Sequence, residues 1–450
     1  MRLYLKKVVQ WLLGVSIFVV VLLNLYKRDV WVYDNDRRPW GPNFEIKEGG
    51  RKKMLFDGPR IHDHASRGVR NMTTGVKQTI RDSVFNSSVD EDLLVYYDKH
   101  FDDEDRILNQ LKFVPKTVKE AIRKGKDPPM KTILIHHGFG GWNIKRGQQT
   151  FIDQKCAVNR CFLTDDRGTG STADAVFFSG QPGRPWTDRP QNQIWVLFML
   201  ESPYHTSGLS GYKNVFNWTA TYRHDSTIVA PYEKFVPYNS SVLTKPQNKN
   251  YAKGKTKKVA WFVSNCGARN GRRRVADELA HHIQVDIYGA CGKFKCPRFQ
   301  SNKCFDMLNR EYKFYLSFEN SNCRDYITEK FFVNGLQHDV IPIVMGAAPE
   351  DYRRSSPPHS YIHVDDFPSI KDLADYLTKL DQNDDLYNEY FRWKGTGSLI
   401  NTFFWCRMCN LLHDKHAPTF VSDIEAWWRG EGVCIGQDSW RDKKYARPKL

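Results

Sequence analysis

The chain has 450 residues, of which 40% are hydrophobic and 26% are charged, and this balance excludes a wholly disordered chain, a collagen-like repeat and a polytopic membrane protein. Its net charge of +16 predicts an anionic partner, such as nucleic acid, an acidic membrane or a phosphorylated small molecule. Ten cysteines are too few for a disulfide-scaffold miniprotein, but they allow several pairs in a secreted enzyme.

The first element in the chain is an apolar run over residues 8–25, with basic residues on both sides. As a helix it would be about 27 Å long, which spans a hydrocarbon core. A cleaved signal peptide is the alternative, but no small-residue cleavage pattern follows the run. The pattern therefore favours a single signal-anchor, with residues 1–7 as a cytoplasmic tail and the rest of the chain in the lumen of the secretory pathway.

Residues 26–127 contain Pro, Gly and many charges but few apolar periods, which predicts an extended stem with one short helix near 118–123. In a lumenal chain the N-x-S/T sequons become candidate glycosylation sites. There are four of them, at Asn71, Asn86, Asn217 and Asn239.

Two series of alternating strands and helices follow, separated by a polar, Lys-rich linker over 238–258. The first series predicts strands at 131–136, 175–178 and 194–200. The second predicts strands at 258–264, 285–288, 314–318 and 340–344, and helices near 272–282, 326–337 and 370–380. Fully apolar strands are typical of parallel sheets that are covered on both faces. The fold class is therefore α/β, with two doubly wound domains that face one cleft.

Residues 314–334 contain the highest concentration of candidate functional side chains. An apolar strand ends at Phe318, a polar loop crosses the carboxyl edge of the sheet, and a helix is predicted from Tyr326 with Asp325 as its N-cap. Open α/β sheets bind ligands at this edge, and a helix N-terminus attracts anions. An ordinary βαβ unit with a solvated Glu329–Lys330 pair explains the spacing equally well.

This segment resembles the signature of the α1,3-fucosyltransferases, which are inverting glycosyltransferases that use GDP-fucose. The matching residues are Phe318-Glu-Asn-Ser321, Asp325-Tyr-Ile-Thr-Glu-Lys330, Asn334 and the Pro-bearing strand 341–346. Further similar segments are 200–205, 216–226, 261–270 and 285–292, so that the resemblance covers about 130–412. The chain departs from the family pattern after Ser226, where a second Asp is frequent, and at Glu233, where Gly is common.

The resemblance implies a GT-B type fold of two Rossmann-like domains, an acceptor-side domain at 128–245 and a GDP-fucose-binding domain at 255–395. The tail, 396–450, would pack across both. It also implies a type II membrane protein of the Golgi apparatus with lumenal catalytic domains. The implied reaction transfers L-fucose to the 3-OH of a GlcNAc residue in a glycoprotein glycan, either in the N-glycan core or in a Lewis-type antenna.

The resemblance also implies roles for single residues. Glu201 would be the general base, and it directly follows an apolar strand, at a carboxyl edge. A nucleoside diphosphate leaving group needs positive charge rather than a second carboxylic acid. The donor-binding residues would be Arg272, Asn320, Tyr326, Glu329 and Lys330. Arg272 begins a run of three arginines, in which a solvated helix residue is the alternative interpretation.

No obligatory cofactor or metal is expected. The Asp-x-Asp spacing at Asp103 and Asp105 lies in the acidic stem, and Asp365 and Asp366 are adjacent, so both are interpreted as solvated charge. Basic side chains take over the metal's role in this interpretation. Stimulation by a divalent cation stays open.

The cysteines allow either zinc or disulfides. Cys406, Cys409 and His413 have a zinc-like spacing, but no second ligand set accompanies them. The resemblance implies a Cys406–Cys409 disulfide. Local pairs Cys156–Cys161 and Cys291–Cys296 are plausible, and the other four cysteines stay unassigned.

Two other classes of protein compete with the enzyme. A nucleic-acid-binding protein would explain the charge, but no binding motif is present and the anchor directs the chain away from nucleic acid. A membrane-tethered carbohydrate-binding protein without transferase activity would share the anchor, the aromatic residues and the sequons. It would not need Glu201 together with Lys330.

Overall fold

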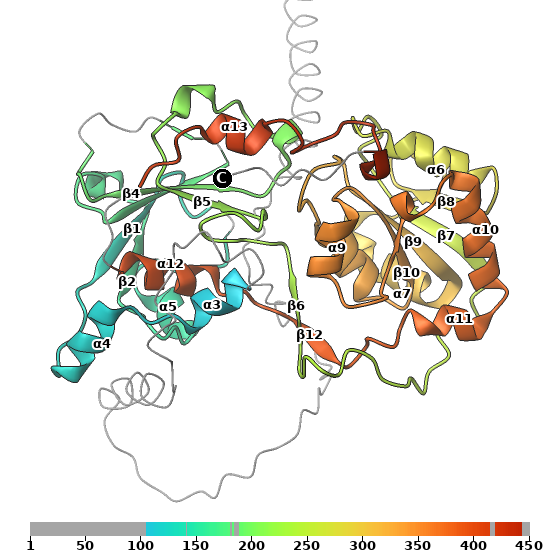
Figure 1. Cartoon of the computed structure of the whole chain (residues 1–450), viewed down its shortest axis with the longest axis horizontal. Coiled ribbons are helices and arrows are strands. Elements are labelled where there is room, and N and C mark those ends of the chain that lie inside the picture. Colours follow the sequence, from blue (N-terminus) through green and yellow to red (C-terminus); the bar gives the residue numbers. More distant parts are fainter. Residues whose placement is uncertain (1–104, 141, 181, 184–188, 415–418, 443–450) are drawn as a thin grey trace, which may run out of the picture. The chain divides into compact units, whose positions relative to one another are not determined.

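The computed structural model describes residues 105–140, 142–180, 182–183, 189–414 and 419–442 (Figure 1). The predicted cytoplasmic tail (1–7), the anchor (8–25) and the sequons at Asn71 and Asn86 lie outside these residues. In the described part of the chain, no helix is both long enough and apolar enough to cross a membrane. All elements named below belong to one compact unit of the chain, which does not include residues 139–144.

The first sheet has five parallel strands in the order β2-β1-β3-β4-β5. They are β1 (Lys131–Ile135), β2 (Cys161–Thr164), β3 (Ala175–Ser179), β4 (Ile194–Met199) and β5 (Trp218–Thr221). Every residue of β4 is buried, which explains why its sequence shows no polar alternation. Around them lie α5 (Gln149–Asp153) and the 3₁₀ turns η1 (Arg167–Thr169), η2 (Pro203–His205) and η3 (Ser210–Tyr212). The three predicted strands are confirmed, whereas β2 and β5 were not predicted.

The second sheet is also parallel, in the order β11-β10-β9-β7-β8. Its strands are β7 (Lys257–Phe262), β8 (Val285–Tyr288), β9 (Tyr312–Phe318), β10 (Ile341–Met345) and β11 (Ile362–His363). Its helices are α6 (Arg272–Ala280), α7 (Ser301–Glu311), α9 (Pro349–Ser355), α10 (Ile370–Asp381) and α11 (Asp384–Glu389), with 3₁₀ turns η4 (Arg298–Gln300) and η6 (Val364–Asp366). The four predicted strands and the helices near 272–282 and 370–380 are confirmed.

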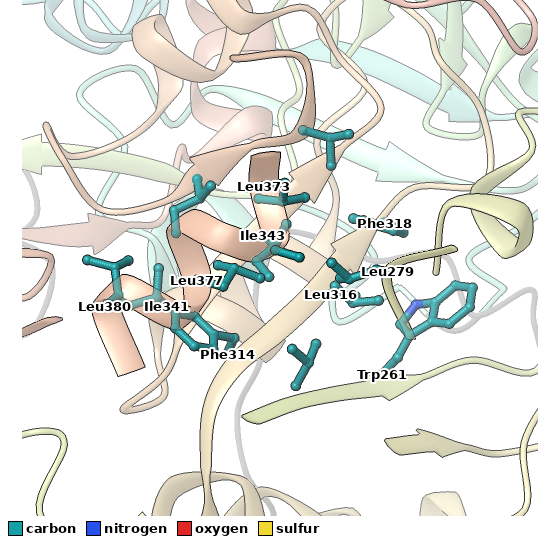
Figure 2. Close-up of a cluster of buried hydrophobic side chains, with 14 of the residues drawn as sticks. Trp261, Leu279, Phe314, Leu316, Phe318, Ile341, Ile343, Leu373, Leu377 and Leu380 are labelled. Carbon is teal, nitrogen blue, oxygen red and sulfur yellow. The ribbon is translucent and has the colours of Figure 1, made fainter. Parts of the chain in front are cut away.

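The core of the second sheet forms where α10 covers β9 and β10 (Figure 2). Leu373, Leu377 and Leu380 recur at helical spacing, and all three are at most 1% exposed. They pack against the apolar side chains of the two strands, including Phe314 and Ile343. This packing holds β9 in place, and β9 leads directly into the loop that contains the candidate donor-binding residues Asn320 and Tyr326.

The predicted helix over 326–337 is wrong at its start. The chain forms a single turn of helix, α8 (Glu329–Phe331), which continues as the π-helical turn η5 (Phe332–Leu336). The N-cap is Thr328, whose side chain accepts a hydrogen bond from the backbone N–H of Lys330. Asp325 cannot be the N-cap, because its φ of 58° places it in the left-handed region.

The predicted stem is also too long, because residues 105–123 are folded onto the body of the protein. They form α3 (Arg106–Lys112) and α4 (Lys116–Arg123), with Ile107 and Val118 buried. The side chain of Gln110 donates to Thr227 O at 2.7 Å and accepts from Arg407 at 2.9 Å. Only a few apolar residues in this charged segment become buried, so its sequence did not predict that residues 105–123 pack onto the folded protein.

The C-terminal residues contact elements of both sheets. β12 (Gly397–Ile400) pairs antiparallel with β6 (Lys234–Pro237), and α12 (Phe404–Leu412), α13 (Ile424–Arg429) and the 3₁₀ turn η7 (Trp440–Asp442) follow. Two disulfides join α12 to the first sheet region. Further along, Trp440 Nε1 donates to Gly346 O, just after β10, at 2.9 Å.

All ten cysteines are paired, but not as predicted. The pairs are Cys156–Cys406, Cys161–Cys409, Cys266–Cys291, Cys296–Cys304 and Cys323–Cys434. The expected local pairs Cys406–Cys409, Cys156–Cys161 and Cys291–Cys296 are therefore wrong. Cys406 and Cys409 are three residues apart on α12 and so share one face of that helix. Each meets a different cysteine there.

Candidate active site

Residues from the two sheets meet at their carboxyl ends. Glu201 follows β4 and is exposed, whereas Tyr326 lies in the loop after β9 and is 1% exposed. The Tyr326 hydroxyl donates to Glu201 Oε2 at 3.4 Å. The turn before Glu201 is held by the hydroxyl of Tyr232, which donates to Leu200 O at 2.9 Å. The structure thus brings together two of the site residues predicted from the sequence.

The cation at the site, Lys330, lies between two carboxylates. Its Nζ is 3.2 Å from Glu319 Oε2 and 3.1 Å from Glu329 Oε1, and it donates to Thr328 Oγ1 at 2.9 Å. Burial opposes the charge of Lys330, but the two carboxylates outweigh burial and raise its pKa. The ammonium group is therefore charged at neutral pH and is fixed in position.

Glu319 is the functional residue that sequence reasoning missed, although it stands inside the recognised motif. It is completely buried, and its carboxylate also accepts hydrogen bonds from the backbone N–H and hydroxyl of Thr328, each at 2.8 Å. The available signal was a carboxylate directly after a mostly apolar strand, because an acid buried there needs a partner.

Arg272 is not a solvated helix residue. Its side chain is 4% exposed and donates to Phe318 O at 2.8 Å and to Asn265 O at 2.9 Å. Its buried Nε has no hydrogen-bond partner among the described residues. Arg272 therefore ties the end of β9 to the loop after β7, with one N–H group uncommitted.

Asn320 lies at the start of the same loop as Tyr326. Its Oδ1 accepts from Ser321 Oγ at 3.1 Å, and Ser321 Oγ is 2.7 Å from Ser202 Oγ, next to Glu201. Ser202 and Ser321 are both fully buried. The residues on the two sides of the site are thus connected by hydroxyl groups that motif matching did not single out.

A further connection between the two sides involves His224, which follows β5. His224 Nδ1 is 2.6 Å from Asp325 Oδ2, and Arg354 of α9 donates to Asp325 Oδ1 at 3.0 Å. Burial would raise the pKa of Asp325, but the hydrogen bond from His224 and the charges of His224 and Arg354 hold it at about 2. The ionised Asp325 keeps the backbone in the conformation that precedes Tyr326.

The two described sequons differ in access. The side chain of Asn217 is 4% exposed, and its Nδ2 donates to Thr419 O at 2.8 Å while its Oδ1 accepts from Trp195 N. This contradicts the prediction of a glycan at Asn217, because the nitrogen that would carry it is used inside the fold. Asn239 is exposed and stays a predicted site.

The zinc alternative for the C-terminal cysteines does not fit the structure. Cys161, Cys409 and His413 form the one group of metal-ligand type found in the described ranges. Its two cysteines are bonded to each other, and His413 Nε2 lies 3.0 Å from Arg160 O. A disulfide offers no thiolate to a metal ion.

The sequence of this chain is similar to known fucosyltransferases over the region that contains the candidate site. Residues 252–427 match the model "Glycosyltransferase family 10 (fucosyltransferase) C-term", and residues 128–233 match "Fucosyltransferase, N-terminal". The chain is 54% identical to the glycoprotein 3-alpha-L-fucosyltransferase A of Drosophila melanogaster, over 76% of this chain and 68% of that protein. It is 33% identical to the human alpha-(1,3)-fucosyltransferase 7, over 67% of this chain and 87% of that one.

Among solved structures, an α1,3-fucosyltransferase with GDP-fucose is similar over 66% of this chain and 94% of its own, with a TM-score of 0.43 and 16% identity. The sequence matches extend over both halves of the catalytic region, and they include the segments that carry Glu201 and Lys330. The chain belongs to the glycosyltransferase family 10 fucosyltransferases.

Proposed function

We propose that this protein transfers L-fucose from GDP-fucose, with inversion, to the 3-OH of a GlcNAc residue on glycoprotein glycans. The observation that carries the proposal is the 3.4 Å contact between Glu201 Oε2 and the Tyr326 hydroxyl. It places a carboxylate from one sheet beside the loop that leads to Lys330 in the other. The Drosophila relative is named a glycoprotein 3-alpha-L-fucosyltransferase, which supports the choice of acceptor class.

The residues divide the chemistry between the two sides of the site. Glu201 accepts the proton of the acceptor hydroxyl as that oxygen attacks the anomeric carbon of fucose. Lys330 and the positive charge of the Arg272 guanidinium stabilise the charge that develops on the departing GDP. Asn320, Tyr326 and Glu329 hold the ribose and the diphosphate. These roles assign the acceptor-side Rossmann-like domain to 128–245 and the donor domain to 255–395, in a GT-B arrangement.

We further propose that the enzyme is a single-pass type II protein of the Golgi membrane, anchored by residues 8–25. The apolar run with its basic flanks supports this location. Because Lys330 and Arg272 supply positive charge, the reaction needs no obligatory metal cofactor. Full activity after treatment with a chelator is the expected result.

The direct test measures GDP release from GDP-fucose by the purified protein, with a core N-glycan and a Lewis-type antennary glycan offered side by side. Release that depends on one of these acceptors, with the product fucosylated at the 3-OH, is expected. GDP release that never depends on a GlcNAc-containing acceptor would contradict the proposal. The preferred glycan identifies the natural acceptor class.

A further inference from the structure

Four polar side chains form a continuous hydrogen-bonded chain across the site. His205 Nδ1 is 2.9 Å from Ser202 Oγ, which is 2.7 Å from Ser321 Oγ, and Ser321 Oγ donates to Asn320 Oδ1 at 3.1 Å. A longer contact of 3.4 Å also joins His205 Nδ1 to Ser321 Oγ. His205 and Ser202 follow the first sheet, whereas Ser321 and Asn320 follow the second. This series of hydrogen bonds thus begins at His205, four residues after Glu201, and ends at Asn320, which we place among the donor-binding residues.

The direction of these hydrogen bonds fixes the tautomer of His205. The Asn320 oxygen is an acceptor, so the Ser321 hydroxyl proton is committed to it. Ser321 must then accept from Ser202, and Ser202 must accept from His205 Nδ1. The single proton of a neutral imidazole therefore sits on Nδ1, and Nε2 presents a lone pair.

The remaining nitrogen, Nε2, has no protein partner among the described residues, and the His205 side chain is exposed. The charged groups that act on this ring are Arg269, Arg272 and Lys330. Partial desolvation of the ring, followed by these three positive charges, lowers the pKa of His205. With the donor site empty, the ring is neutral at pH 7, and its free lone pair lies in the field of the cations.

A bound diphosphate would favour the protonated form of the His205 ring instead of the neutral form. Two of the three cations, Arg272 and Lys330, are the groups that we place against the diphosphate, and its negative charge cancels their repulsion of a protonated ring. A lone pair on Nε2 would then face an anion, which is unfavourable. Protonation of Nε2 by water converts it into a donor for a charge-assisted hydrogen bond.

We propose that His205 is a further donor-binding residue, which takes up one proton when GDP-fucose binds and donates a hydrogen bond from Nε2 to a diphosphate oxygen. The proton comes from solvent, and no bond of the donor breaks in this step. The inference rests on the proposed function, because it assumes that the diphosphate lies against Lys330 and Arg272. It makes the loop that carries the base also respond to the presence of the donor.

The experiment is calorimetric titration of the full-length protein with GDP-fucose in the absence of acceptor, at pH 7, in buffers of small and large ionisation enthalpy. GDP-fucose suits this test because it lacks the terminal phosphate of GDP, which titrates near pH 6 as phosphate monoesters do. The expected uptake is close to one proton per donor bound. Repeating the titration across pH should show affinity falling by up to about tenfold per pH unit on the alkaline side.

Two substitutions separate the contact from the titration. His205→Gln places a neutral amide N–H near the position of Nε2, so proton uptake should vanish and the affinity should no longer depend on pH. His205→Asn lacks that donor and should also bind GDP-fucose about tenfold or more weakly. His282→Gln, which removes an exposed histidine two residues after α6, is the matched control and should leave the uptake unchanged.

The outcomes separate this inference from the proposed function. If the wild-type protein does not bind GDP-fucose, the proposed function fails. If it binds GDP-fucose without taking up a proton, or if His205→Gln takes up as much as the wild type, His205 does not have this role. The wild-type measurement decides the question even if one of the variants fails to fold.

Discussion

Lys330 keeps its charge in a half-buried position because Glu319 and Glu329 lie on either side of it. We expect Lys330→Ala to weaken GDP binding by about 1.5–3 kcal/mol, or roughly 10- to 100-fold, because a charge-assisted contact to the diphosphate is lost. Calorimetric titration with GDP measures the change. Thermal unfolding must show that the variant is folded, because the substitution leaves Glu319 buried without its cation. A folded variant with wild-type affinity for GDP would place Lys330 on a solvated face.

Glu201 should affect turnover rather than donor affinity. Glu201→Gln keeps the shape of the side chain but removes the proton acceptor, so kcat should fall by about 10²–10⁴-fold. GDP binding should change little, because Glu201 is not one of the groups that we place against the diphosphate. Steady-state kinetics with saturating donor provides the measurement. If Glu201 only orders its own turn, the folded variant will retain more than about a tenth of wild-type turnover, and the base must be sought elsewhere.

His338 provides a test of pH dependence away from the site. Its ring stacks on Phe305 at 4.4 Å, and burial together with the charge of Lys394 lowers its pKa to about 4. Since the folded pKa lies below the unfolded value of about 6.5, the folded state binds fewer protons, and stability should fall as the pH drops from 6.5 towards 4.

Between pH 7 and pH 5 we expect this group to reduce the free energy of unfolding by about 1–2 kcal/mol. Denaturant titrations of the wild type and of His338→Gln at both pH values isolate the effect. The variant should lose less stability on acidification than the wild type. Equal losses in the two proteins would mean that His338 titrates normally in the folded state.

At the scale of elements, most strands of both sheets were predictable because their burial on two faces leaves apolar runs, unbroken in β4 and interrupted only by Lys313 and Ser317 in β9. The start of α8 was not predictable. Aspartate is a frequent N-cap residue, but the conformation of Asp325 is set by contacts with His224 and Asp351, which are distant in sequence. Local propensity cannot include such contacts. Among site residues, the motifs indicated Glu201, Tyr326 and Lys330, whereas Ser202 and Glu319 were overlooked because their contacts with Ser321 and Lys330 arise only in the folded chain.

The cysteine pairing depended on tertiary structure in the same way, and it leads to a prediction. The Cys161–Cys409 disulfide spans 248 residues, whereas Cys296–Cys304 spans eight. In the chain-entropy model these loops are worth about 5 and about 2–3 kcal/mol respectively.

The Cys156–Cys406 disulfide closes almost the same long loop, so both long pairs must be removed to open it. Replacing their four cysteines by serine should therefore destabilise the protein at least about twice as much as replacing Cys296 and Cys304. Thermal unfolding of the two variants, with the unmodified protein beside them, makes the comparison. If the short pair is the more costly to remove, native-state packing rather than loop closure dominates its contribution.

At the scale of the whole molecule, the anchor and most of the stem should be dispensable for chemistry. The folded body begins by residue 106, at α3, so deletion of residues 1–28 leaves every described element intact. We expect a protein in which a cleavable signal peptide replaces residues 1–28 to be secreted and active, as measured by activity in the culture medium. Secretion of the full-length protein with a new N-terminus near residue 25 would instead indicate a cleaved signal peptide.

The connectivity of the disulfides has a consequence for biosynthesis. Cys156 and Cys161 leave the ribosome together, while their partners Cys406 and Cys409 follow about 250 residues later, after the whole second sheet. During that interval the two early thiols have only each other and other early cysteines to react with, so vectorial synthesis favours the local pair that the finished protein does not contain. Reaching the native state then requires thiol–disulfide exchange after the last helices emerge. The yield of this protein in a heterologous host should therefore depend on its disulfide isomerase capacity more than on its oxidising power.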